Sequence, residues 1–164
     1  MVELELLRQL QPFKDMNERH LKNLQPKCEI IEFQKGDKLF AEGDDAIHLW
    51  VVREGCVHLR FELPDNRPTS DEMTVDKVEV EEKSRVLGWS CFVPPYKMRL
   101  SAYCVTESCK IVRVLKSDLL QLFNDDAKMG YLFMSYMIKV VGFRFHQFQN
   151  HVAQNMGEDL MFGW

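Results

Sequence analysis

Between residues 27 and 115, turn-forming residues such as Gly36-Asp37, Glu42-Gly43-Asp44 and Glu54-Gly55 divide the chain into short apolar segments. From residue 57 to residue 62, apolar and polar side chains alternate strictly, as expected for a strand with one buried face. The candidate strands are residues 28–33, 38–41, 47–53, 56–62, 73–82, 102–106 and 109–115. Short strands at this spacing predict a mainly β fold, an antiparallel jelly-roll or β-roll.

Helical patterns flank this region on both sides. Leu6, Leu7 and Leu10 recur at helical spacing before Pro12, and a second short helix follows Asn17, a suitable N-cap. At the other end, Ser117 is placed to cap a helix over residues 118–123, and the acids before residue 127 open a longer one. We therefore predict one structural domain made of N-terminal helices (1–26), a β-roll (27–116) containing a cassette at 86–106, and C-terminal helices (117–156).

The long C-terminal helix carries two apolar seams. The first seam is Met129, Phe133, Tyr136, Val140 and Phe143; the second seam is Met134, Ile138, Val141, Phe145, Phe148 and Val152. A helix that covers one surface needs only one such stripe, so two stripes favour packing on the domain plus contact with a partner helix. We predict a homodimer joined through the first seam. The alternative is a monomer in which the helix is buried on both sides.

Composition excludes several classes of function. The net charge of −4 and pI near 5.7 argue against direct nucleic-acid binding. The apolar runs are far shorter than the roughly 20 residues of a membrane span, and Glu3 and Glu5 interrupt any signal peptide, so we expect a cytoplasmic chain. The five cysteines form no C-x-x-C pair and are expected to be reduced; a zinc site at Cys104 and Cys109 is the minor alternative.

No catalytic arrangement stands out in the sequence. His48 and His58 lie ten residues apart on different candidate strands, and no histidine spacing typical of a catalytic metal is found. We therefore expect a protein that is not an enzyme and that needs no cofactor.

The cassette at residues 86–106 contains no acid, and its only charges are Lys97 and Arg99. A glycine at Gly88, a following short turn, a basic side chain and small hydroxyl residues together can hold an anion. The candidate ligand-binding residues are Gly88, Trp89, Ser90, Lys97, Arg99, Leu100 and Ser101. A structural loop anchored by two prolines has a similar sequence and is the alternative.

The order of short helices, β-roll, cassette, further strands and a long helix resembles the cyclic nucleotide-binding domain. This is the regulatory module of the catabolite activator protein and of the regulatory subunits of cyclic AMP-dependent kinase. The resemblance covers about residues 5–150 and is carried by Phe33, Gly36, Leu39-Phe40, Glu42-Gly43-Asp44, Gly55 and the cassette from Gly88 to Ala102. It implies a pocket for a cyclic nucleotide or another phosphate-bearing small molecule, and signalling through the C-terminal helix to an unknown downstream protein.

The cassette departs from the family pattern at two points. Where nucleotide-binding members have a glutamate that accepts a ribose hydroxyl, this chain has Trp89, whose indole only donates. The family's phosphate-binding arginine corresponds to Arg99 in the longer alignment and to Lys97 in the shorter one. About ten residues follow the long helix, which is too few for the family's DNA-binding module, so we expect no complete transcription factor. A non-binding scaffold whose pocket is filled by Trp89 is the alternative function.

Overall fold

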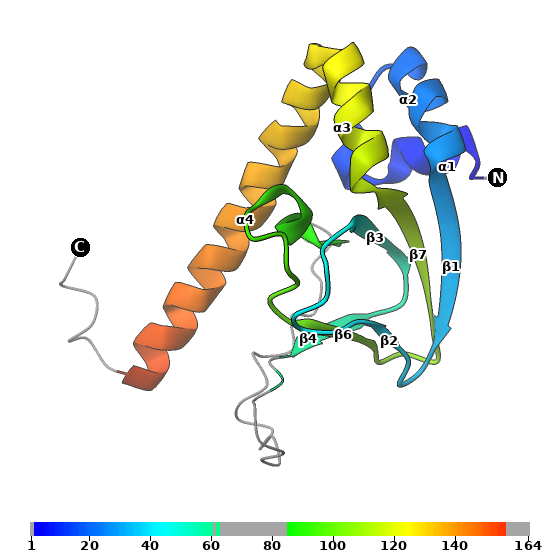
Figure 1. Ribbon diagram of the computed structural model, residues 1–164. Helices are drawn as coiled ribbons and strands as arrows, with labels where there is room; N and C mark the ends of the chain where they lie inside the picture. The colour runs from blue at the N-terminus through cyan, green and yellow to red at the C-terminus, as the bar shows by residue number, and fades with distance from the viewer. Residues whose placement is uncertain (1, 61, 63–84, 157–164) are drawn as a thin grey trace.

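The computed structural model describes residues 2–60, 62 and 85–156, and the chain folds into a β-roll flanked by helices (Figure 1). The predicted strand at 73–82 lies outside the described residues. In chain order the elements are α1 Leu4–Gln9, η1 Gln11–Phe13, α2 Glu18–Leu24, η2 Gln25–Lys27, β1 Cys28–Gln34, β2 Lys38–Phe40, β3 His48–Glu54, β4 Val57–Arg60, β5 Val86–Leu87, η5 Trp89–Phe92, β6 Ser101–Cys104, β7 Ser108–Leu115, α3 Lys116–Asp125 and α4 Ala127–Met156, where η marks a 3-10 helix.

Two antiparallel sheets form the roll, as the short alternating segments predict. One sheet has the strand order β1-β7-β3-β5, and the other has the order β2-β6-β4. On β3, Leu49 and Val51 face the helices, while Trp50 and Val52 face the interior of the roll. Because both faces of this strand are covered, its central residues form a continuous apolar run.

Side chains fill the interior of the roll. Trp50 is 5% exposed, and its ring lies 5.7 Å from that of Phe40 and 6.3 Å from that of Phe33. Met98 of the cassette is buried in the same cluster. The space enclosed by the two sheets is therefore mostly protein.

A second apolar cluster joins the helices to the outer face of the larger sheet. Its centre is Phe133 of α4, which is fully buried. The Phe133 ring lies 6.2 Å from Phe13 in η1, 5.7 Å from Phe92 in η5 and 5.0 Å from Phe123 in α3, measured between centroids. One side chain thus connects α4 with the N-terminal helices and with the cassette.

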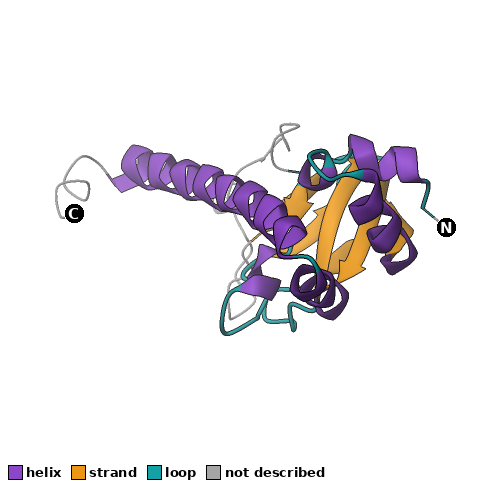
Figure 2. Cartoon of the chain, turned by 90° about the horizontal axis from the view of Figure 1, so that it is seen from above, coloured by secondary structure: helices purple, strands orange, loops and turns teal. Residues whose placement is uncertain are grey.

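The burial of α4 corrects the expected dimer interface. Met129, Phe133 and Val140 of the first seam are 1%, 0% and 2% exposed and pack inside the chain's own core, and Tyr136 and Phe143 are half-buried. The three buried residues have no surface left for a partner helix. The second seam is the outward one: Ile138, Phe145 and Phe148 are each more than half exposed. Its helix leaves the body of the molecule and projects beyond it (Figure 2).

Two of the four described α-helices, α2 and α4, begin just after a residue whose side chain accepts main-chain N–H groups. The Asn17 side chain accepts the backbone N–H of His20 at 2.9 Å, which confirms the predicted cap of α2. Asp126 precedes α4 and accepts the N–H groups of Lys128 and Met129. The cap predicted at Ser117 is wrong, because α3 already begins one residue earlier without a side-chain cap.

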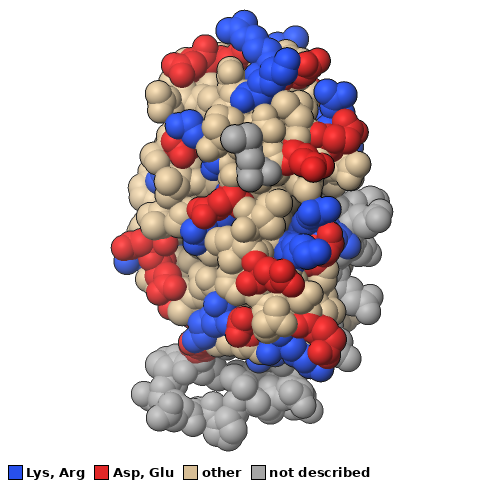
Figure 3. Space-filling view, turned by 90° about the vertical axis from the view of Figure 1, so that its right-hand side faces the viewer, with Lys and Arg blue, Asp and Glu red and all other residues tan. Residues whose placement is uncertain are grey.

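Charges of both signs mix on the face formed by the edge of the larger sheet and the short helices (Figure 3). Several of them pair: Lys27 with Asp118 at 3.1 Å and Arg113 with Glu29 at 2.9 Å. This face presents no broad patch of one sign in the view of Figure 3. Within the described residues, no helix is long and apolar enough to cross a membrane.

Candidate functional site

The cassette leaves the larger sheet through a tight turn at Gly88. After β5, which pairs with β3, Gly88 adopts φ +80°, and the 3-10 helix Trp89–Phe92 follows at once. A Cβ atom at Gly88 would lie 2.7 Å from the carbonyl oxygen of His48. Both the positive φ and this close approach require glycine, which explains why the turn can sit against β3.

The second half of the cassette is tied to the Glu-Gly-Asp turn by main-chain hydrogen bonds. The N–H of Ala46 donates to the carbonyl of Tyr96 at 2.8 Å, and the N–H of Met98 donates to the carbonyl of Asp44 at 2.8 Å. The N–H of Gly43 in turn donates to the carbonyl of Met98 at 2.9 Å. The two sequence motifs that were recognised separately thus form one structural unit.

A small cavity of about 40 Å³ lies between the cassette, the smaller sheet and α4. Its described lining is Phe40, Leu59, Gly88, Trp89, Ser90, Met98, Arg99, Leu100 and Arg144. Two of these residues are arginines and none is an acid. The other residues of this described lining are uncharged, so the two arginines are its charged members. The cavity is thus suited to an anionic group.

Arg99 and Arg144 come to the cavity lining from two different parts of the chain, the cassette and α4. Arg99 extends from the cassette, is exposed, and makes no ion pair with another described residue. Arg144 extends from α4, and its Nη2 donates to the carbonyl oxygen of Val86 at 2.8 Å. Burial lowers the pKa of Arg144 to about 10, so the group is still charged at neutral pH.

Five of the seven predicted ligand-binding residues line the cavity: Gly88, Trp89, Ser90, Arg99 and Leu100. Lys97 does not. It is exposed and pairs with Asp45 at 2.7 Å, outside the cavity lining. Of the two basic candidates, the structure brings only Arg99 to the cavity.

Ser101 is also separate from the cavity. It is fully buried on β6, where its Oγ accepts the backbone N–H of Glu42 at 2.8 Å. Hydrogen bonds from Tyr103, Ser101 and Lys38 hold the pKa of Glu62 at about 2. The Ser101 hydroxyl therefore serves a contact between strand ends.

Sequence reasoning missed Arg144. Its position continues the buried stripe Met129, Phe133, Met137 and Val140 at helical spacing, so it marks a charged residue on an otherwise apolar face. A charge in such a stripe is unusual unless it has a partner or a function. The two seams were defined from apolar residues alone, so this charged position on the same face of the helix was left out.

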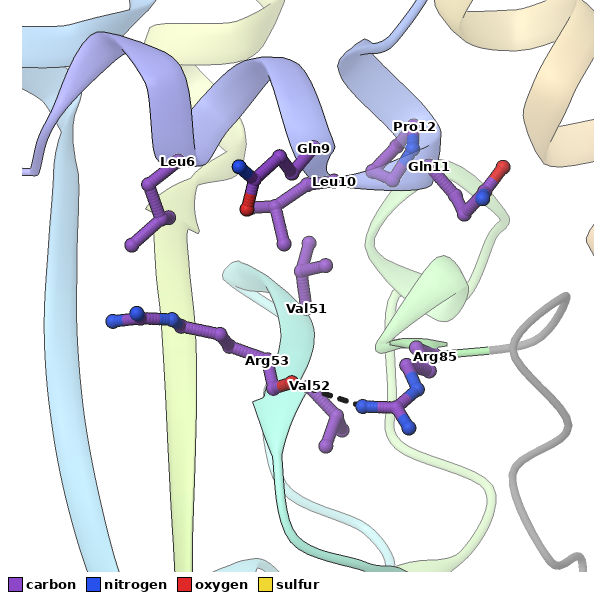
Figure 4. Close-up of a pocket in the computed structure, with 9 residues that line it drawn as sticks. All are labelled: Leu6, Gln9, Leu10, Gln11, Pro12, Val51, Val52, Arg53 and Arg85. Atoms are coloured by element: carbon purple, nitrogen blue, oxygen red, sulfur yellow. Dashed lines mark hydrogen bonds between the residues drawn. The ribbon is translucent and has the colours of Figure 1, made fainter.

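A larger groove of about 290 Å³ lies beneath α1 and η1 (Figure 4). Leu6 and Leu10 face Val51 across it, and the guanidinium of Arg85 donates to the carbonyl of Arg53 at 2.9 Å. None of the predicted ligand-binding residues lines this groove. The predicted residues converge on the smaller cavity instead.

The thiols and other potential metal ligands do not form a metal site within the described residues. All five cysteines are free, and no group of three His, Cys, Asp or Glu side chains is placed to hold an ion. Cys104 and Cys109 lie with their sulfur atoms 2.7 Å apart in the core. Burial raises the pKa of Cys104 to about 12, so this thiol stays protonated at neutral pH.

Solved structures with the same architecture give the fold its name. A cyclic nucleotide-binding domain from Methylobacillus flagellatus superimposes with a TM-score of 0.73 at 17% identity, over 95% of this chain and 84% of its own. The sensor domain of the transcriptional regulator DNR from Pseudomonas aeruginosa matches with a TM-score of 0.59 at 17% identity, over 87% and 86%. The chain has the cyclic nucleotide-binding domain fold.

A regulatory domain of a kinase is a further solved structure with this fold. The regulatory domain of Toxoplasma gondii PKA, solved with cAMP, matches with a TM-score of 0.62 at 12% identity, over 85% of this chain and 48% of its own. No protein-family model matches the sequence, and no curated protein matches it either. The resemblance inferred from the glycines and the cassette is thus confirmed at the level of the fold.

Proposed function

We propose that this chain is a regulatory module that senses a phosphate-bearing small molecule and signals through α4. One observation carries the proposal: the cavity at the cassette contains two arginines and no described acid, at the point where the cassette meets α4. In the cyclic nucleotide-binding fold, the named neighbours are binding, sensor and regulatory domains. These structural neighbours support a sensing role for this chain rather than a catalytic one.

The contact between the cassette and α4 provides a route for the signal. Phe92 lies in η5 together with the cavity residues Trp89 and Ser90, and its ring lies 5.7 Å from that of Phe133 in an edge-to-face arrangement. An anion that shifts η5 therefore changes the packing of Phe133, and with it the position of α4. Ligand binding biases α4 to the extent that the ligand distinguishes its two positions.

The test compares two cations that lie two residues apart. Arg99→Gln removes the cation at the cavity, and Lys97→Gln removes one outside it. In a thermal-shift screen of cyclic mononucleotides, cyclic dinucleotides and small phosphates, a ligand at 100 times its dissociation constant adds about 2.7 kcal/mol of stability. We expect Arg99→Gln to lose this stabilisation and Lys97→Gln to keep it. If no compound stabilises the wild type, the non-binding scaffold with Trp89 in the pocket is the better description.

We further propose that a homodimer forms through the second seam of α4. The apolar residues of this seam recur at spacings of four and three, which is the pattern of a two-helix coiled coil, and Met134, Ile138, Phe145 and Phe148 among them are exposed. Ile138 is 68% exposed and Phe145 is 52% exposed. Large apolar side chains exposed along one face are typical of an interaction surface. In such a dimer, a change in the position of α4 would be transmitted to the partner subunit.

Sedimentation of the protein at tens of micromolar tests the dimer by comparing substitutions at two adjacent residues, Ile138 and Lys139. Ile138→Glu places a charge in the second seam and is expected to give a monomer. Lys139→Glu makes a larger change of charge at an exposed position next to the seam, and is expected to leave the dimer intact. A wild-type chain that sediments as a monomer would exclude this interface.

A further inference from the structure

The groove beneath α1 and η1 is separate from the cavity at the cassette. The described linings of the two sites share no residue. At about 290 Å³, the groove is close to the lower limit of the roughly 300–1,000 Å³ that small-molecule sites occupy. It is therefore large enough for a small organic molecule, which would bind there without contacting the described residues of the cassette cavity.

One part of the groove is a fixed apolar surface. Leu6 and Leu10 lie on the helical side, and Val51 of β3 points toward them from the strand (Figure 4). Pro12 of η1 adds to the same lining. Leu10 and Val51 are 7% and 1% exposed and belong to one packed cluster, so neighbouring side chains hold them in place. This part of the groove is suited to the apolar portion of a ligand.

Arg85 supplies a positive charge on the opposite part of the lining. Its guanidinium is turned toward β3, where Nη1 donates to the carbonyl of Arg53 at 2.9 Å (Figure 4). The main-chain carbonyl of Arg85 accepts the N–H of Val52 at 2.8 Å, which fixes the residue against the strand. Arg53 pairs with Glu54 at 3.3 Å, whereas Arg85 forms no ion pair with a described residue. Of the two arginines in the lining, Arg85 is the one whose charge is available to an anion.

The charges of the lining indicate which anion fits. No described residue of the lining is acidic, and Gln9 and Gln11 contribute neutral amide groups. A guanidinium has five N–H donors, so Arg85 can still donate to both oxygens of a carboxylate. One unpaired guanidinium balances one negative charge, and a second charge placed against the apolar part of the groove would be costly. The lining therefore favours a monoanion with an apolar portion.

We propose that this groove binds a small organic carboxylate, with the carboxylate on Arg85 and the apolar chain between α1 and β3. The inference goes beyond the proposed sensing function, because it concerns a second site with a different class of ligand. Occupancy of this site requires neither Arg99 nor any other described residue of the cassette cavity.

Three probes separate the contribution of the charge from that of the chain. Hexanoate has both features, hexanol lacks the charge, and acetate lacks the chain. Each is titrated at neutral pH into the isotope-labelled chain, while the backbone amide signals of Val51 and Val52 are followed by NMR. We expect hexanoate to bind about tenfold more tightly than hexanol, because the charge-assisted hydrogen bonds are made only by the carboxylate. Acetate should bind more weakly than hexanoate, because it makes no apolar contact.

Variants then assign the charge to Arg85. Arg85→Gln should remove the preference for hexanoate and leave the affinity for hexanol unchanged. Arg8→Gln is the matched control, since Arg8 is an exposed cation of α1 outside the described lining, and it should leave the preference unchanged. Leu6→Trp should weaken the binding of both probes, because the larger side chain occupies the apolar part. If Arg85→Gln fails to fold, Arg85→Lys keeps a charge without the fork and should retain part of the preference.

The outcomes distinguish this inference from the proposed sensing function. Equal affinities of the wild type for hexanoate and hexanol overturn the inference, as does an unchanged preference in Arg85→Gln. Arg99→Gln should bind hexanoate as the wild type does; a loss of binding in this variant would assign the carboxylate to the cassette and contradict a second site. If a phosphate compound binds through Arg99 and hexanoate does not bind at all, the sensing function stands and only the inference fails.

Discussion

Replacement of Phe133 tests whether α4 and the cassette are energetically connected. Its ring is fully buried and contacts Phe13, Phe92 and Phe123 from three other elements. Truncation to alanine removes the ring and leaves a cavity, at a cost of about 3–5 kcal/mol. Each aromatic contact contributes about 0.5–1.5 kcal/mol of that total. Since a domain of this kind is stable by about 5–15 kcal/mol, Phe133→Ala brings it close to unfolding.

Urea unfolding followed by circular dichroism measures the effect. Phe133→Leu keeps much of the apolar surface and should lose less stability than Phe133→Ala. Lys139→Ala, at an exposed position on the same helix, should change stability by at most about 0.5 kcal/mol. Hydrogen exchange in Phe133→Leu should also rise across residues 89–92, because the edge-to-face contact with Phe92 is lost. A loss below about 1 kcal/mol for Phe133→Ala would show that the buried ring is not the junction described here.

Three further predictions follow from the site and its surroundings. Gly88→Ala should destabilise the chain, because the new Cβ would clash with the His48 carbonyl at φ +80°; Gly142→Ala, with open space around it, should stabilise α4 by about 0.5–1 kcal/mol in the same melts. Burial, together with the charge of Arg113, lowers the pKa of His48, so the unfolded chain takes up the proton first and stability falls as the pH drops below 6.5; His48→Gln should flatten that part of the stability profile. Calorimetry should detect weak or no binding of cyclic AMP, because Trp89 accepts no hydrogen bond from a ribose hydroxyl, and Trp89→Glu should raise the affinity; sub-micromolar binding by the wild type contradicts this.

The sequence was most informative where backbone conformation restricts the choice of residue. Gly88 and Gly43, the glycine of the Glu-Gly-Asp turn, both take positive φ values. Glycine is favoured at such positions, so each requirement can be recognised from a single residue. Alternation placed the strands that have one buried and one more exposed face, as in Val57–Arg60. These features located the roll and the cassette together.

The sequence was less informative where the answer depends on which surfaces meet. The two seams of α4 are equally apolar, so periodicity alone could not decide that Val140 faces the core and Ile138 faces outward. For the same reason Arg144 could not be assigned to the cavity, since its neighbours there belong to distant segments of the chain. The choice between Lys97 and Arg99 depended on Asp45, which pairs with Lys97 across the two motifs.

Because α4 projects beyond the roll, a small change in the angle of this helix produces a large displacement at its far end. From Phe133 to the end of the helix at Met156, the axis runs about 35 Å at 1.5 Å per residue. A tilt of about 10° around Phe133 therefore moves the far end sideways by about 6 Å, which is more than half of the roughly 8–10 Å between the axes of two packed helices. Such a sideways displacement is enough to disrupt the packing of α4 against a partner helix. In the sensing function proposed above, a slight adjustment at Phe133 would thus become a change at the end of α4 that a partner could detect.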